Sequence, residues 1–158
     1  MEGWDNFFVG QLGASATLAG LLFVAVSINL ARIIQFKNLP LRAMESLLAF
    51  LSVLVVATFA LAPHQKLSTV GLEVGFTGAT LWGVQTWSLA KTFAEDKKYQ
   101  RTFWRVLANQ IHAFPFMVSG VLLCTGHENG LYWLIPGTLL AFMVGILNSW
   151  VLLIEIQR

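Results

Sequence analysis

Charged residues are scarce in this chain. They make up 11% of its 158 residues, and apolar residues make up 56%, whereas a typical soluble protein carries about 25% charged residues. A soluble domain of this length needs many more polar side chains to cover its surface, because only its core is dry. The composition therefore argues against a soluble enzyme, a nucleic-acid-binding module and a disordered linker. It predicts an integral membrane protein, whose partner is the lipid bilayer.

Cysteine and a strong charge imbalance are also missing. The chain has one cysteine, Cys124, which excludes an intrachain disulfide framework and a zinc site built from several thiolates of one chain. Ten Lys and Arg against eight Asp and Glu give a net charge of +2. This charge is too small for a surface that binds a polyanion, so we expect no nucleic-acid partner.

The sequence lacks the common catalytic and cofactor motifs. It contains no G-x-S-x-G, no Walker A motif, no G-x-G-x-x-G and no C-x-x-C. It also offers no Ser or Cys nucleophile beside His112 and no paired carboxylates within an apolar stretch. We therefore expect a protein that is not an enzyme, with no catalytic residues and no cofactor.

Long apolar stretches dominate what is present. A helix needs about 20 apolar residues to cross roughly 30 Å of hydrocarbon. Five stretches meet or approach this length, and the connections between them are short. They predict an all-α bundle of five transmembrane helices in a single domain, 1–158. The expected spans are residues 6–31, 43–62, 68–90, 103–124 and 131–154.

The basic residues predict the orientation of these spans. With five spans, nine of the ten Lys and Arg fall on one side, and Lys66 alone falls on the other. Cytoplasmic loops of membrane proteins are enriched in Lys and Arg. We therefore expect the N-terminus outside and the C-terminus in the cytoplasm.

Small residues recur at helical spacing in several of the spans. In lipid, helices associate by close packing through such residues. These residues could pack helices within one chain or join separate copies of the chain. A bundle of five helices offers few internal partners for several small-residue faces, which favours a homo-oligomer. The candidate packing residues are Gly13, Thr17 and Gly20 in the first span, and Gly71, Gly75, Ala79 and Gly83 in the third.

The fourth span carries polar residues on one helical face. Arg105, Asn109 and His112 follow one another at intervals of four and three. Polar residues at such depth usually face the bundle interior and often mark an ion or proton path. In the alternative interpretation, Arg105 reaches the membrane surface and a neutral His112 bonds to a neighbouring helix. Glu73 in the third span is the other candidate for a polar path.

Histidine and acidic residues also gather at the predicted outer side. His64, His127 and Glu128 could together bind a divalent cation. No close sequence spacing ties any pair of them together. A solvated acidic rim is the simpler interpretation, and we predict no metal site.

The first span carries a family resemblance. Its sequence GQLGASATLAGLLFVAVSINL, from Gly10 to Leu30, is followed by Arg32-Ile33-Ile34 and then by Leu39-Pro40. This pattern resembles a group of small multi-pass inner-membrane proteins of bacteria, over residues 1–65. Some members are labelled as modulators of the membrane-anchored AAA protease. The resemblance implies a multi-pass protein of the cell inner membrane, and it implies no catalytic or ligand residue.

Two functions follow from these patterns. The first is a non-enzymatic interaction or regulatory subunit of an oligomeric membrane assembly, which binds another membrane protein through a glycine-rich face. The alternative is a homo-oligomeric ion channel or small transporter with a polar path along the fourth span.

Overall fold

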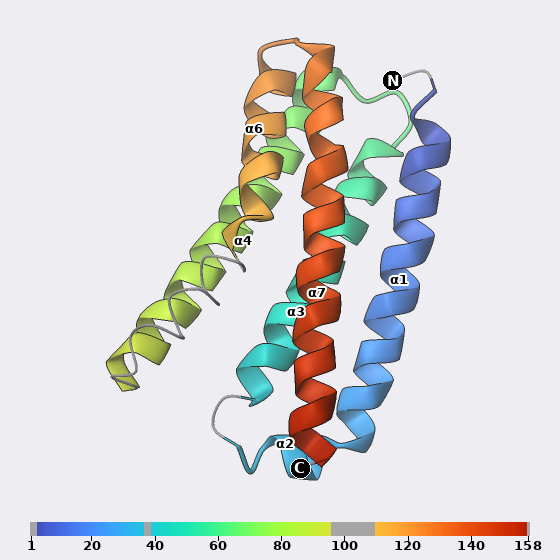
Figure 1. The fold of residues 1–158 in the computed structure, drawn as a ribbon. Helices are drawn as coiled ribbons and strands as arrows, with labels where there is room; N and C mark the ends of the chain where they lie inside the picture. The colour runs from blue at the N-terminus through green and yellow to red at the C-terminus, as the bar shows by residue number, and fades with distance from the viewer. Residues whose placement is uncertain (1–2, 37–38, 96–109, 158) are drawn as a thin grey trace.

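The computed structural model describes residues 3–36, 39–95 and 110–157. All regular structure in these residues is helical, which confirms the all-α prediction. In chain order the elements are α1 (Asp5–Ile28), α2 (Leu30–Ile33), α3 (Leu39–Ala60), α4 (Leu67–Glu95), α6 (Ala113–Cys124), the 3₁₀ helix η1 (Glu128–Trp133) and α7 (Leu134–Gln157) (Figure 1).

The long helices form an elongated bundle. α3 packs against both α1 and α7, while α1 and α7 barely touch each other. α4 and α6 form an antiparallel pair, and the last part of α4 leans away from α3 (Figure 1). We call the end at which α1 begins the outer end of the bundle, and the end at which α7 finishes the inner end.

Among the described residues, three segments are long and apolar enough to cross a membrane. They are Asp5–Ile28, Leu39–Ala60 and Glu128–Ile154, the last of which joins η1 to α7. α6 has only 12 residues, which span about 18 Å at 1.5 Å per residue. Five spans and the orientation of the chain therefore stay predictions, and residues 103–109 of the fourth expected span lie outside the described residues.

Proline lies in the first turn of three helices, and Pro136 is the third residue of α7. Pro40 is the second residue of α3 and Pro115 the third residue of α6. A proline costs little there, because the first amide groups of a helix have no partner within it. We expected one continuous helix over 103–124. Instead, Ile111 and His112 form a turn, and α6 starts at Ala113.

Two buried clusters hold the bundle together. The outer one is centred on Phe8, Phe116 and Leu134, and the inner one on Leu22, Phe50 and Leu152. α3 contributes to both and is the central helix. Within its most apolar 18 residues, 56% are buried, against 17% for α1. α1 therefore lies at the edge of the bundle with most of its surface uncovered in the described structure.

Candidate functional site

α4 and α6 touch through glycine. A Cβ atom added to Gly71 would lie 2.6 Å from the backbone nitrogen of Cys124, and one added to Gly120 would lie 2.6 Å from the nitrogen of Gly75. A Cβ on Gly78 would lie 2.9 Å from the nitrogen of Met117. These positions have no room for a side chain, so the two backbones are in direct contact. Gly71, Gly75 and Gly78 of α4 thus serve packing within the chain.

The other two candidate packing residues of α4 lie off this contact. Ala79 and Gly83 are exposed, and a Cβ on Gly83 would meet no atom of the described residues within 4 Å. The reason is the helical period of 3.6 residues, which rotates each step of four by about 40°. A row spaced strictly by four therefore leaves the interface, and the contact continues at Gly78 instead of Ala79.

We call residues 110–124 the α6 segment. Toward the inner end of the bundle, polar side chains of α4 contact the first residues of this segment. The Nε2 atoms of Gln85 and His112 lie 3.3 Å apart. Gln110 Nε2 donates to the hydroxyl of Thr86 at 3.2 Å. His112 is fully buried and Gln85 is 5% exposed. Ser119, which lies seven residues after His112, is also fully buried. The face that carries these two side chains is therefore turned into the bundle.

A buried carboxylate joins this polar region from α3. The hydroxyl of Ser88 donates to Glu45 Oε1 at 3.3 Å, and both residues are buried. Ser88 lies three residues after Gln85, so α4 presents both polar side chains on one face. On that face, Ser88 bonds to the Glu45 carboxylate and Gln85 lies beside the His112 imidazole. Glu45 was not among the candidate site residues, because its partner Ser88 lies 43 residues further along the chain.

Glu73 belongs to a different part of the molecule. It is half-buried near the outer end of α4, and its Oε1 accepts a hydrogen bond of 3.1 Å from Gln65 Nε2. Glu73 precedes Gln85 by 12 residues, or about 18 Å of helix. The described structure therefore does not bring Glu73 and His112 together. Arg105 and Asn109, the remaining members of the expected polar path, lie outside the described residues.

The outer histidines are exposed. His127 Nδ1 lies 3.0 Å from the hydroxyl of Thr125, and His64 adopts a positive φ of 59° in the connection between α3 and α4. Among the described residues, no three His, Cys, Asp or Glu side chains gather closely enough to hold a metal ion.

The small-residue face of α1 points away from the rest of the bundle. A Cβ added to Gly10, Gly13 or Gly20 would meet no atom of the described structure within 4 Å. Thr17 is exposed, and its hydroxyl donates to the carbonyl of Gly13 at 2.8 Å, so its donor is used within the helix. A different face is buried within the bundle, and it carries Phe8, Ser15, Ala19 and Leu22.

Comparison with known proteins adds no family to this picture. No family model, no curated protein and no solved structure matches the chain. The resemblance of its first 65 residues to small bacterial inner-membrane proteins therefore stays a prediction.

Proposed function

We propose that the chain is a non-enzymatic, multi-pass protein of the cell inner membrane and an interaction or regulatory subunit of an oligomeric assembly. It associates with another transmembrane helix through the α1 face formed by Gly10, Gly13, Thr17 and Gly20. The partner that best fits this face is a second copy of the chain, and another membrane protein is the alternative partner.

One observation carries this proposal. The small-residue face of α4 is partly occupied within the described structure, because Gly71 and Gly75 meet α6. The face of α1 meets nothing within the described structure. Close packing through small residues drives the association of helices in lipid, because hydrophobicity provides little attraction there. From Gly10 to Gly20 the face covers about 15 Å of helix.

Glycine-to-isoleucine variants test the proposal. In Gly13→Ile and Gly20→Ile, a branched side chain holds a partner helix away from α1, and the purified protein should shift from oligomer to monomer. Gly83→Ile is the matched control, because Gly83 is equally exposed but lies on α4. Native mass spectrometry in detergent measures the change. Loss of the oligomer in the control alone would place the interface on α4 and contradict the proposal.

A homo-oligomeric ion channel or small transporter is the second candidate. It is favoured by the polar side chains between α3, α4 and the α6 segment, namely Glu45, Ser88, Gln85 and His112. Buried ionisable residues within membrane helices often mark such paths. Purified protein in liposomes should then conduct ions or protons, and His112→Ala should alter the pH dependence of the flux. An absence of flux in a well-oriented preparation would remove this candidate.

A further inference from the structure

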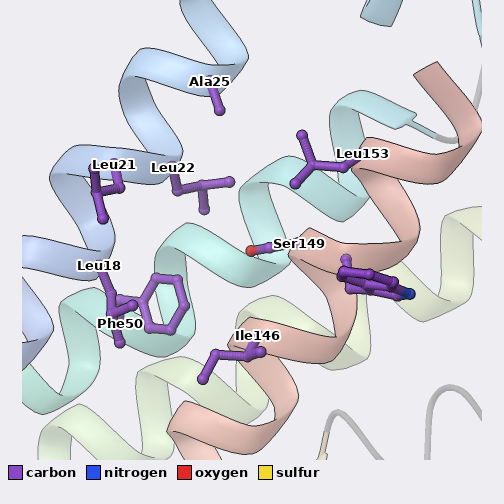
Figure 2. Close-up of a pocket in the computed structure, with 9 residues that line it drawn as sticks. Leu18, Leu21, Leu22, Ala25, Phe50, Ile146, Ser149 and Leu153 are labelled. Atoms are coloured by element: carbon purple, nitrogen blue, oxygen red, sulfur yellow. The ribbon is translucent and has the colours of Figure 1, made fainter. Parts of the chain in front are cut away.

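Buried oxygen atoms without a hydrogen bond lie away from the groove between α1 and α7. Side chains that line this groove are mainly hydrocarbon (Figure 2), and the hydroxyl of Ser149 in the lining donates to the carbonyl of Gly145 at 2.7 Å. The oxygens that lack a partner within the described residues belong to other side chains. Two of these side chains, Gln65 and Glu73, are bonded to each other.

Gln65 and Glu73 form their pair at the outer end of the bundle. Gln65 lies in the connection between α3 and α4, and Glu73 lies in the second turn of α4. Nε2 of Gln65 donates to Oε1 of Glu73 at 3.1 Å. The amide oxygen of Gln65 and the second carboxylate oxygen of Glu73 are both buried and accept no hydrogen bond from the described residues. An ionised carboxylate has no donor, so these two oxygens cannot satisfy each other.

The surroundings of Glu73 do not supply the missing donor. Thr77, one turn further along α4, uses its hydroxyl for the backbone carbonyl of Glu73 at 2.8 Å. The ionisable groups near this end are His64 and Lys66 in the connection and Cys124 at the end of α6, and all three side chains are exposed. The outer half of α3 carries no ionisable residue. Within the described part of the chain, the Glu73 carboxylate therefore has one hydrogen bond, from Gln65.

One proton resolves both deficits. A protonated carboxyl gains an O–H donor and keeps its carbonyl oxygen as an acceptor. The carboxyl of Glu73 can then donate to the amide oxygen of Gln65 while it still accepts from Nε2. A carboxylic acid and a primary amide are planar groups of the same shape, so the two hydrogen bonds can close a ring. Buried polar atoms are nearly always satisfied in native structures, which favours this arrangement.

A metal ion is a poorer occupant of the pair. Hard cations such as Ca²⁺ and Mg²⁺ take about six or more oxygen ligands. Gln65 and Glu73 offer two oxygens that lack a partner, and no group of three His, Cys, Asp or Glu side chains gathers among the residues that the structure describes. The chemistry of the pair therefore fits a proton better than a metal ion.

We propose that Glu73 is a proton-binding site. The bound proton joins the carboxyl of Glu73 to the amide of Gln65 by two hydrogen bonds and thereby fastens the connection between α3 and α4 onto α4. Loss of the proton leaves one hydrogen bond and two buried oxygens without a donor, so the connection is held less firmly at higher pH. The inference depends neither on association through α1 nor on a polar path through His112.

Infrared spectroscopy of the full-length protein in detergent micelles tests the site. The spectrum of wild type minus that of Glu73→Gln isolates the C=O stretching band of the protonated Glu73 carboxyl. Glu128→Gln isolates the band of an exposed carboxyl at the same end of the bundle. As the pH is lowered, the Glu73 band should appear before the Glu128 band. It should also lie at a lower wavenumber than in a Gln65→Leu background, because a hydrogen bond to the carbonyl oxygen weakens the C=O bond.

Three results of this titration would overturn the proposal. If a water molecule donates to both oxygens, Glu73 stays ionised and its band appears no earlier than that of Glu128. If Gln65 is not the partner, the band has the same wavenumber in wild type and in Gln65→Leu. If the pair holds a metal ion, sodium chloride suppresses the band and choline chloride does not.

Thermal unfolding gives a second, independent measurement. Glu73→Gln replaces the acid by an amide, which donates and accepts at the same two positions at every pH. Wild type should unfold at the same temperature as Glu73→Gln in acid and at a progressively lower temperature as the pH rises, because the folded state binds the proton more tightly than the unfolded state. Glu128→Gln is the matched control and should follow wild type. A difference between wild type and Glu73→Gln that does not change with pH would contradict the proposal.

Discussion

A methyl group added to Gly120 tests how tightly α4 and α6 are joined. In Gly120→Ala the new Cβ would lie 2.6 Å from the nitrogen of Gly75 and 2.9 Å from the carbonyl oxygen of Gly71. Ordinary contacts between such atoms are about 3.5 Å or longer. The neighbouring atoms are backbone and cannot rotate away, so α4 has to retreat by nearly 1 Å. Overpacking of this kind costs about 1–3 kcal/mol.

The direction of this effect is opposite to helix propensity. Alanine is the better helix former by about 1 kcal/mol, so a helix free of contacts would gain stability from the substitution. Gly83→Ala is the matched control, because its Cβ would meet nothing within 4 Å in the part of the chain that the structure describes. Unfolding in mixed micelles measures both variants against wild type. A Gly120→Ala protein as stable as Gly83→Ala would refute the direct contact of the two backbones.

Three further changes probe the rest of the bundle. Phe50→Ala should lower the free energy of unfolding by about 3 kcal/mol, the low end for a buried Phe, because the protein is surrounded by lipid and mainly packing is lost. Thr58→Ala, at an exposed position on the same helix, is the control. A smaller loss of stability in Phe50→Ala than in Thr58→Ala would contradict the inner cluster. Gln85→Leu should cost about 1–3 kcal/mol, since it removes a bonding partner of the buried His112. Thr86→Ala should lower the stability less than Gln85→Leu, because the bond between Thr86 and Gln110 is only partly buried. A larger loss in Thr86→Ala would argue against the buried pair of Gln85 and His112. In a Cys124→Ser background, cysteines at Lys66 and Lys97 should react with impermeant reagents from opposite sides of the membrane, and labelling from one side would exclude five spans.

Much of the fold was predictable because long apolar runs leave few alternatives. The all-α class is confirmed, and α1, α3 and α7 lie within or close to the expected apolar stretches. The turn at Ile111–His112 was not expected, because polar residues spaced by four and three are typical of a continuous helix. Pro115 is compatible with a helix interior or a helix start from sequence alone, and its place in the first turn of α6 depends on the chain before it.

The contacts of the candidate site were harder to predict, because they depend on partners that are distant in sequence. Small residues recur at helical spacing in both α1 and α4, but Gly71 meets the backbone of α6 while Gly13 meets no described atom. Only the arrangement of the helices separates an occupied face from an exposed one. Glu45 illustrates the same limit, since its partner Ser88 belongs to a different helix.

A disulfide scan along α1 tests the central claim most directly. In a Cys124→Ser background, single cysteines are placed at Gly13, Thr17 and Gly20 on the outward face, and at Ser15, Ala19 and Leu22 on the buried face. If two copies associate through α1 about a two-fold axis, equivalent residues approach each other. Oxidation in native membranes should then give disulfide-linked dimers at the three outward positions and none at the three buried positions. Dimers at the buried positions, or at none of the six, would contradict association through this face.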